Sequence, residues 1–242
     1  MTGGSSGIGA ALTGELLGAG EDVVVWDRVA PGDGRAAYQL VDLTAPHGVE
    51  DAASKLEAPV STVVHCAGLL LSSGVTSPDL VGHMRLEYEL HVVALARVVQ
   101  ATLASLIETQ GSVIGLASAA MSVVYPASAA YGCSKAAVER LIQQLAVELG
   151  PSGVRANAVA PGAVDTPMTA RVWADRERAA RRRASIPLGR RADPDEVVKV
   201  IRFLASDDAR YITGETVWVD GGARHGMLAA REGHGPASAK KR

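Results

Sequence analysis

Aromatic residues and cysteine are scarce in this chain of 242 residues, which has 4% Phe, Trp and Tyr and two cysteines. Two cysteines cannot build a disulfide framework, and Cys66 and Cys133 both lie in segments with a buried pattern. We therefore expect reduced thiols and a cytoplasmic protein. No ligand set surrounds Cys66, and the histidines show no metal-ligand spacing, so we expect no metal site.

A strong charge bias and a membrane-spanning run are also missing. The formal net charge is −2, so nothing global directs the chain to nucleic acid or to an anionic membrane surface. We find no apolar run of 18 residues and no basic-then-apolar leader. These absences predict a soluble protein with neither nucleic acid nor a membrane as partner.

Small aliphatic residues and glycine are abundant, with 48% apolar residues and 26 glycines. This composition suits a parallel sheet covered by helices. Short β-branched runs alternate with helical patterns, which predicts an α/β fold with a doubly wound, mostly parallel sheet and helices on both faces. The expected strands are residues 21–27, 37–41, 61–66, 112–117, 154–159 and 216–219. The expected helices are an opening one from Ile8, then 46–56, 80–109, one ending at Leu149, and 194–205, with Asp193 as N-cap.

A glycine-rich loop opens the chain. Gly3, Gly7 and Gly9 stand directly before a helix, where glycine allows a close approach of backbone N–H groups to a diphosphate. Asp27 ends the next strand, and a carboxylate there can accept hydrogen bonds from an adenosine ribose and repel a 2′-phosphate. The loop predicts dinucleotide binding and favours NAD(H), while the guanidinium of Arg28 keeps NADP(H) open as the alternative.

The stretch from Ser118 to Lys135 carries the candidate chemistry. Tyr131 and Lys135 are four residues apart, so a helix over both places them on one face. A nearby ammonium lowers the pKa of a phenol, and the Ser118 hydroxyl could hold a substrate oxygen. The three side chains together predict a proton-transfer site.

These motifs, in this order, resemble the short-chain dehydrogenase/reductase family over residues 2–222. The resemblance implies a Rossmann-type fold and NAD(P)(H)-dependent interconversion of an alcohol and a carbonyl, with a small-molecule substrate. The motifs are Thr2–Gly9, Asp42-Leu43, Cys66-Ala67-Gly68, Ser118, Tyr131-x-x-x-Lys135, Asn157-x-x-x-Pro161-Gly162 and Asp220-Gly221-Gly222.

The same resemblance implies the site residues. Tyr131 would be the general acid/base, Ser118 would hold the substrate oxygen, and Lys135 would lower the phenol pKa and bind the nicotinamide ribose. The implied cofactor-binding residues are Gly3, Ser5, Ser6, Gly7, Ile8, Gly9, Asp27, Asp42, Leu43, Cys66, Ala67, Gly68, Tyr131, Lys135, Pro161, Gly162, Val164 and Thr166.

Three positions depart from the family pattern. Members carry a strand before the glycine loop, whereas only Met1 precedes Thr2 here, so we expect an open slot in the sheet and a misplaced start. His91 stands where the family has an Asn that serves a water relay to the lysine; it is a further catalytic candidate, although a tolerated helix residue is an equal reading. Cys66 replaces a common Asn as a small, mostly apolar side chain.

We expect one domain over residues 1–225, because neither an internal repeat nor a second hydrophobic core is found. Residues 168–191 match the family's substrate lid, and residues 226–242 read as a disordered tail. The lid has eight arginines; we favour a solvated exterior over a site for an anionic substrate such as an acyl-CoA, and place nucleic acid last. They are Arg171, Arg176, Arg178, Arg181, Arg182, Arg183, Arg190 and Arg191.

Two further expectations rest on the family pattern. Relatives pair through the helices corresponding to 80–109 and 129–150, so we expect a homodimer or homotetramer. The alternative function is a nucleotide-binding regulatory or catalytically impaired protein that holds NAD(P) without efficient turnover, because of His91 and the absent strand.

Overall fold

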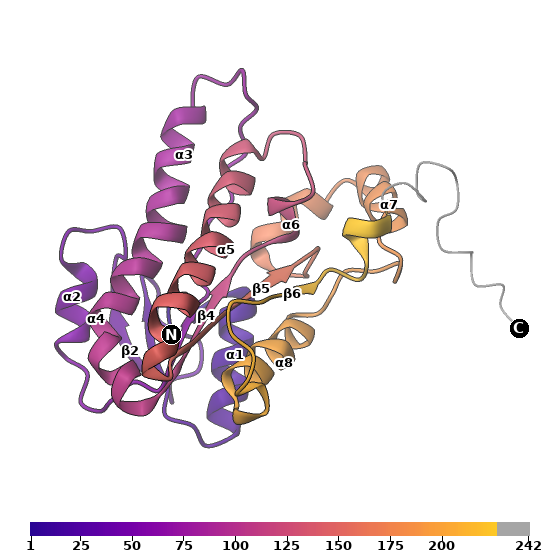
Figure 1. The fold of residues 1–242 in the computed structure, drawn as a ribbon. Coiled ribbons are helices and arrows are strands. Elements are labelled where there is room, and N and C mark those ends of the chain that lie inside the picture. Colours follow the sequence, from indigo (N-terminus) through magenta and orange to yellow (C-terminus); the bar gives the residue numbers. More distant parts are fainter. Residues whose placement is uncertain (227–242) are drawn as a thin grey trace, which may run out of the picture.

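The computed structural model describes residues 1–226. Six parallel strands form its sheet: β1 Val24–Asp27, β2 Ala37–Leu40, β3 Thr62–His65, β4 Ser112–Leu116, β5 Arg155–Pro161 and β6 Thr216–Val219. β1 pairs with β2, and β3 to β6 follow one another in order. The doubly wound fold class is confirmed, with helices on both sides of the sheet (Figure 1).

Thr2 joins β1 to β3, at the place where we expected an open slot. Its N–H donates to the Val64 carbonyl at 3.0 Å, and its own carbonyl accepts from Cys66 N–H at 3.1 Å. On the other side, Trp26 N–H donates to the Met1 carbonyl at 2.9 Å, so Thr2 bridges both strands. The expectation of an open slot is wrong at this level of the sheet, because two extended residues suffice to satisfy both neighbouring backbones there.

Two apolar layers bury the two faces of the sheet. One core combines Leu12 of α1 (Gly7–Gly18) and Ile201 of α8 (Pro194–Ala205) with residues such as Ile114 of β4. The other combines alternate strand residues with α2 (Gly48–Ala53), α4 (Ala94–Thr109) and α5 (Ala129–Leu149). Because both faces are covered, β5 is buried from Ala156 onward.

The long helical segment expected at residues 80–109 is present but contains a wider turn. α3 (Leu80–Tyr88) leads into a π-helical turn, η1 (Glu89–Val93), and then into α4. The whole segment from Leu80 to Thr109 contains an 18-residue window with a mean hydropathy of 1.7. By length and composition it could cross a membrane, although we expected no such run from the sequence. Since 44% of that window is buried and Leu95, Val98 and Leu106 pack in the core, the composition is that of a core helix.

The arginine-rich segment is helical in two parts, α6 (Pro167–Trp173) and α7 (Arg176–Ala184), followed by a loop to α8. Asp193 caps α8 through a reciprocal capping box with Glu196, as its sequence position predicted. Near the C-terminal end of the described residues, Gly226 is buried and lies against Pro187, so the described structure continues one residue past our expected boundary at 225. The rest of the expected tail, residues 227–242, lies outside the described residues.

Short 3₁₀ turns complete the described elements: η2 Ala119–Met121, η3 Gly150–Ser152 and η4 Asp207–Ala209. Only η2 bears on function, because it begins at Ser118 and shapes the backbone between β4 and α5. Figure 1 shows this backbone at the same end of the molecule as α6 and α7. The pieces of sequence expected to carry chemistry therefore gather at one end of the sheet.

Candidate active site

One cavity of about 360 Å³ lies at the carboxyl ends of the strands. It is lined by every residue that the sequence singled out for cofactor binding or catalysis except Ser5 and His91. Residues from the glycine loop, five strand ends and the start of α5 therefore converge, although they are spread over more than 160 positions of sequence. This edge of a parallel sheet is where open α/β folds bind their ligands.

Several lining residues were missed by the sequence reading. Leu69, Pro167, Met168 and Thr169 directly follow predicted site residues, so their proximity could have been inferred from adjacency alone. Leu86 and Leu90 come instead from α3 and η1, and no local pattern in the sequence pointed to them. The remaining missed residues are Trp26, Val41, Thr44, Leu116 and Ala117.

The glycine loop has no room for a side chain at Gly3 or Gly9. A Cβ on Gly9 would lie 1.9 Å from the Gly3 carbonyl oxygen, and one on Gly3 would lie 2.5 Å from Ala67 N. Gly3 also has φ of +67°, in the left-handed region that favours glycine. Ser6, at the N-cap of α1, makes no side-chain cap, so the first-turn N–H groups face the cavity without a side-chain acceptor. This cradle fits a dinucleotide diphosphate.

Asp27 ends β1 on the wall of the same cavity. Its Oδ2 accepts Ser5 N–H at 3.1 Å and its Oδ1 accepts Val29 N–H at 3.3 Å. Because a carboxylate can accept about four hydrogen bonds, capacity remains for ribose hydroxyls. Ser5 therefore does not line the cavity but positions the carboxylate that does. Arg28 also lines the cavity, as its place in the sequence suggested.

The helix over the central stretch begins at Ala129, so it covers both Tyr131 and Lys135 as required. Lys135 is 4% exposed, and its Nζ donates to the Leu116 carbonyl at 2.7 Å. The ammonium lies 5.7 Å from the centre of the Tyr131 ring, and Ser118, which follows the end of β4, lines the same cavity. The three predicted groups thus meet in one place.

Burial has the largest effect on the pKa values of both Lys135 and Tyr131. It lowers the pKa of Lys135 to about 8, so the side chain is still mainly an ammonium at neutral pH. It raises the pKa of Tyr131, with a smaller opposing effect from the Ser118 hydroxyl and a further increase from the Glu87 charge. The pKa of Tyr131 is therefore raised and not lowered as we expected, because loss of water around the phenolate has the largest effect; the part played by Lys135 stays a prediction.

His91 lies behind the cavity wall, completely buried. Its Nε2 accepts the Leu69 N–H at 3.0 Å, which places the ring proton on Nδ1, 2.9 Å from Ser134 Oγ. The ring also meets Tyr131 edge-on at 5.7 Å. Burial lowers the pKa of His91, so the imidazole is neutral. Both nitrogens are occupied by protein groups, and these contacts tie the loop after β3 to α5; a catalytic role stays a prediction.

Glu87 is a functional candidate that the sequence reading missed. It is fully buried one helical turn before His91, and its Oε1 accepts Leu71 N–H at 2.7 Å. Glu87 and His91 thus accept hydrogen bonds from two N–H groups of the loop after β3, those of Leu71 and Leu69. Burial raises the pKa of Glu87, and its Oε2 has no hydrogen-bond partner among the described residues.

We expect Glu87→Gln to shift the pH profile of alcohol oxidation to lower pH. Glutamine keeps an acceptor for the Leu71 N–H but removes the charge that raises the pKa of both Tyr131 and Lys135. The basic form of Tyr131 should therefore appear at lower pH, and kcat/KM measured across pH should show its rise moved in the same direction. Glu89→Gln, which removes a partly exposed partner of Arg97, is the control and should leave the profile in place. An unchanged profile in Glu87→Gln would show that this charge does not reach Tyr131.

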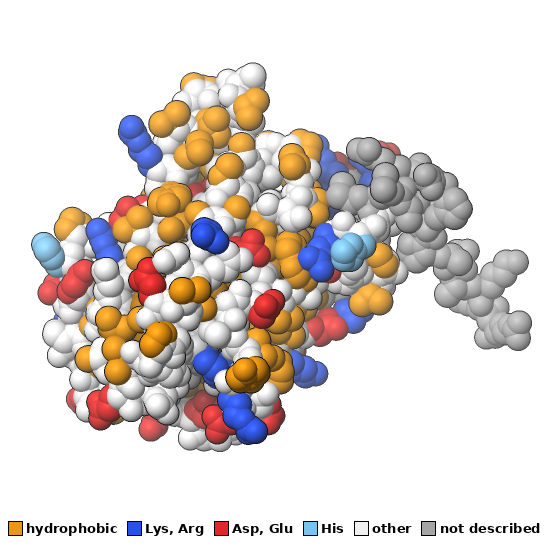
Figure 2. Space-filling model, in the orientation of Figure 1, with side chains coloured by type: hydrophobic (Ala, Val, Ile, Leu, Met, Phe, Trp, Pro, Cys, Tyr) orange, Lys and Arg blue, Asp and Glu red, His pale blue; other side chains and the backbone are white. Residues whose placement is uncertain are grey.

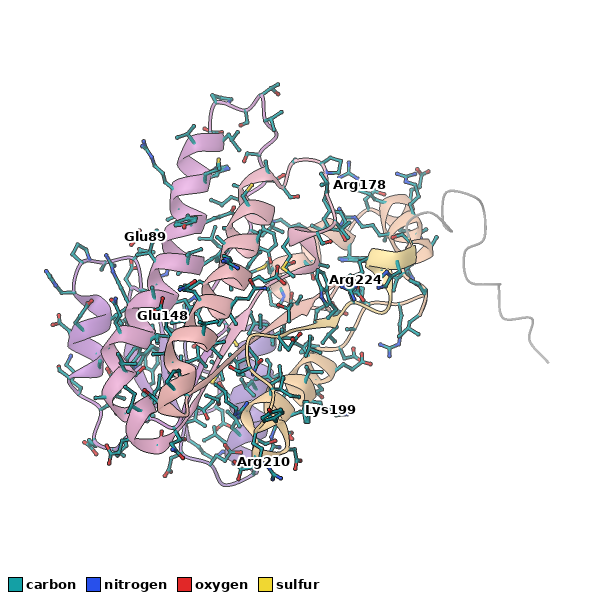
Figure 3. The ribbon with its side chains drawn as sticks, in the orientation of Figure 1. Glu89, Glu148, Arg178, Lys199, Arg210 and Arg224 are labelled. Atoms are coloured by element: carbon teal, nitrogen blue, oxygen red, sulfur yellow. The ribbon has the colours of Figure 1, made fainter. Side chains whose placement is uncertain are left out.

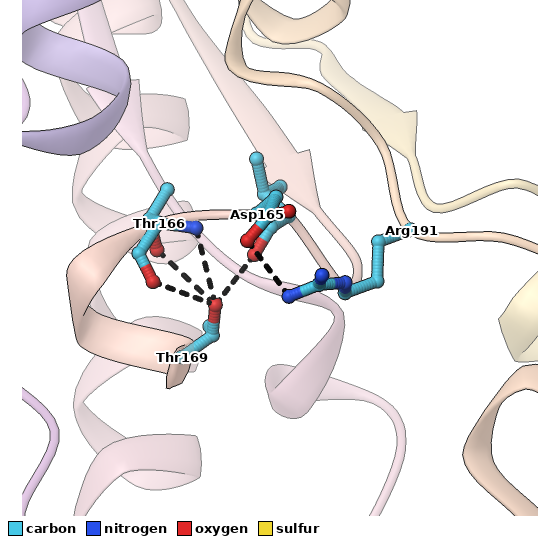
Figure 4. A network of polar contacts seen from close by, with 5 residues as sticks. Asp165, Thr166, Thr169 and Arg191 are labelled. Atoms are coloured by element: carbon cyan, nitrogen blue, oxygen red, sulfur yellow. Dashed lines mark hydrogen bonds and ion pairs between the residues drawn. The ribbon is translucent and has the colours of Figure 1, made fainter. Parts of the chain in front are cut away.

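A threonine pair fixes the start of the lid (Figure 4). Thr169 Oγ1 donates to the Val164 carbonyl at 2.6 Å and lies 3.3 Å from the Thr166 N–H, which closes a capping box at α6. Asp165 is held in addition by Arg191 at 2.7 Å. Since Thr166, Met168 and Thr169 line the cavity, this network positions its outer wall.

The two cysteines differ in their surroundings. Cys66 lines the cavity, and burial raises the pKa of its thiol to about 12, so it is an unreactive small side chain. Cys133 is exposed on α5, which contradicts the buried pattern expected there, because its side of the helix faces solvent. Within residues 1–226 no group of three potential ligands is placed to hold a metal ion.

Comparison with known proteins points to one family. A family model described as enoyl-(acyl carrier protein) reductase matches residues 3–224. Mouse (3R)-3-hydroxyacyl-CoA dehydrogenase is 34% identical, with 92% of this chain and 94% of the relative covered. The cis-4-hydroxycyclohexanecarboxylate dehydrogenase of Sinomonas cyclohexanicum is 32% identical over 92% and 94%.

Solved structures agree. A putative NAD(P)-dependent gluconate 5-dehydrogenase from Beutenbergia cavernae with bound NADP is 34% identical and superposes with a TM-score of 0.85, covering 92% of this chain and 94% of that one. The 4-hydroxyisoleucine dehydrogenase complexed with NADH has the same TM-score at 24% identity, which shows the fold alone.

The fold and the cavity define a nicotinamide-dependent oxidoreductase that interconverts alcohols and carbonyls. The chain belongs to the short-chain dehydrogenase/reductase family, as the order of its motifs indicated.

Proposed function

We propose that the protein is a cytoplasmic, NAD(H)-preferring dehydrogenase of secondary alcohols in which Tyr131 is the general acid/base. The convergence of Ser118, Tyr131 and Lys135 on the cavity that also contains the glycine loop carries this proposal. The bound cofactor would accept or supply the hydride. Ser118 would hold the substrate oxygen, and Tyr131 would take the hydroxyl proton in oxidation and return it in reduction.

Lys135 has two tasks in this scheme. Its buried ammonium favours the phenolate of Tyr131 once the proton is taken, and its position beside Gly68 lets it reach a ribose hydroxyl. The hydrogen bond from Nζ to the Leu116 carbonyl fixes the side chain between α5 and β4. His91 and Glu87 would act indirectly, by holding the loop that contains Gly68 and Leu69.

Asp27 supports the preference for NAD(H). A carboxylate at the ribose position repels a 2′-phosphate, and the contact with Ser5 N–H holds it there. Asp27→Asn keeps an acceptor but loses the charge, so we expect the ratio of kcat/KM for NAD over NADP to fall roughly tenfold, since one like-charge contact near a protein surface is worth on the order of 1 kcal/mol or more.

The measurement is steady-state oxidation with each cofactor. Asp33→Asn is the matched control, because that carboxylate pairs only with the exposed Arg35 and does not line the cavity. A wild-type preference for NADP, or a ratio unaffected by Asp27→Asn, would overturn the assignment of Asp27.

Turnover itself is tested over a panel of secondary alcohols with both cofactors, beside fluorescence titration of NADH. The rival function is a protein that binds the cofactor without turnover, which His91 favours because both of its ring nitrogens are already satisfied by protein groups. Tight NADH binding with no turnover on any alcohol or ketone of the panel would favour that rival.

We further propose a homodimer or homotetramer assembled through α4 and α5. Support comes from apolar side chains exposed on these helices, Ile107 on α4 and Val147 on α5, with Val147 74% exposed. Light scattering coupled to size-exclusion chromatography tests this assembly. A monomer at micromolar concentration would contradict it.

A further inference from the structure

The lid concentrates positive charge in a chain whose formal net charge is −2. Between residues 167 and 191 there are eight arginines but only two acidic residues, Asp175 and Glu177. Five of these arginines lie on α7, a helix of nine residues in which only Ala179 is buried. A cluster of one sign beside a cavity raises the local concentration of oppositely charged ligands.

Three of the eight arginines are used within the fold. Arg181 pairs with Glu177, Arg190 with Glu196 and Arg191 with Asp165. Within residues 1–226 no ion pair is found for Arg178 or Arg182, which lie one turn apart on the same face of α7. These two guanidinium groups are therefore available to an anion from outside the chain.

Arg182 connects this face of α7 to the loop that joins two of the candidate site residues. Its guanidinium lies 5.8 Å from the centre of the Tyr125 ring, in the loop between Ser118 and Tyr131. Burial raises the pKa of Tyr125, and the positive charge of Arg182 partly opposes that rise. Met168 and Thr169 of the preceding helix α6 line the cavity itself. Figure 3 shows Arg178 on the same side of the molecule as α7 and that loop, far from Arg210.

Figure 2 shows Lys and Arg side chains on several parts of one face of the molecule, among them the side where α7 lies. Arg178 and Arg182 are about 6 Å apart along the helix axis. Two guanidinium groups over that span exceed what one small carboxylate requires, but they suit a ligand with several phosphate groups.

We propose that Arg178 and Arg182 bind the phosphate groups of a coenzyme A thioester whose acyl chain enters the cavity and brings a 3-keto or 3-hydroxyl group to Tyr131. The inference rests on the proposed function, because it identifies the substrate class of the same site. It agrees with the chemistry of the relatives, whose named substrates carry an anionic group away from the reacting alcohol. The cofactor diphosphate has its own cradle at the glycine loop, so these arginines are not needed for it.

The test compares three ketone substrates with NADH. Acetoacetyl-CoA has the phosphates, S-acetoacetyl-N-acetylcysteamine has the same acyl thioester without them, and acetoacetate has only a carboxylate. For the double variant Arg178→Gln/Arg182→Gln, we expect kcat/KM on acetoacetyl-CoA to fall roughly 10- to 100-fold, mainly through KM. The other two substrates should be unaffected, and wild-type kcat/KM on acetoacetyl-CoA should fall with rising salt.

Arg210→Gln is the matched control, because Arg210 is an exposed arginine remote from α7 and should leave all three substrates unchanged. Calorimetric binding of free coenzyme A in the presence of NADH gives a readout that needs no turnover, and the double variant should weaken it by a similar factor. NADH affinity should be the same in every variant.

The inference is overturned if coenzyme A does not bind, if the variant affects acetoacetate rather than acetoacetyl-CoA, or if it weakens NADH instead. In each case turnover of the phosphate-free ketones would leave the proposed function intact. Coenzyme A binding that depends on these arginines, without turnover of any alcohol or ketone, would instead contradict the proposed dehydrogenase while supporting the phosphate site.

Discussion

Tyr131→Phe is expected to lower kcat by a factor of roughly 10² to 10⁴, with little change in NADH affinity. The variant removes only the proton-carrying hydroxyl, and general acid–base catalysis by one positioned group contributes about that factor. The phenyl ring keeps its edge-on contact with His91 and its place beside Lys135. Steady-state oxidation and NADH fluorescence titration, measured on the same preparation, separate loss of chemistry from loss of binding.

Tyr125→Phe is the matched control for that experiment. Tyr125 is also a partly buried tyrosine of the loop before α5, but it does not line the cavity. We expect the control to keep most of the wild-type turnover. If Tyr131→Phe retained more than about a tenth of wild-type kcat, another group would have to carry the proton.

Gly9→Ala is expected to have the largest effect on cofactor binding and stability. The new Cβ would lie 1.9 Å from the Gly3 carbonyl oxygen and 2.8 Å from its carbonyl carbon, both of them backbone atoms that cannot rotate away. The loop must open to accept the methyl group, which would displace the first-turn N–H groups that form the diphosphate cradle. We expect no measurable NADH binding and a loss of unfolding free energy on the order of 3 kcal/mol or more.

Gly14→Ala in the same helix is the control that isolates the steric cause. Nothing lies within 4 Å of a Cβ at Gly14, so alanine there should raise stability by about 0.5–1 kcal/mol through its higher helix propensity. Urea unfolding of the two variants and the wild type measures both effects. Equal stability of Gly9→Ala and Gly14→Ala would mean that the loop does not have the close packing described.

Local sequence patterns determined most of the framework. The apolar spacing from Val138 to Leu149 set the phase of α5, so the pairing of Tyr131 and Lys135 on one face followed before any contact was known. The N-cap at Asp193 and the buried strands β3 and β4 could also be predicted, because each depends on neighbours within a few residues. The predicted boundaries of short elements such as α2 differed more from the structure, because tertiary contacts decide where such elements end.

Local sequence patterns could not explain the positions at which the chain departs from the family pattern. The sequence left His91 open as a relay or a passive residue, since its meaning depends on Leu69 and Ser134, 22 and 43 residues away. Nothing local marked Glu87 as buried against the cofactor loop, or Arg182 as a neighbour of Tyr125.

Short sequence patterns, and the family resemblance that they support, were therefore enough to predict the family, the order of the strands and helices, and the catalytic candidates that line the cavity. The periodicities and spacings behind these conclusions are properties of short segments. Contacts between distant segments establish that Thr2 bridges two strands, that burial raises the pKa of Tyr131, and that His91 ties a loop to α5. Each of these depends on distance and solvent exclusion between segments far apart in the chain, which no local pattern encodes.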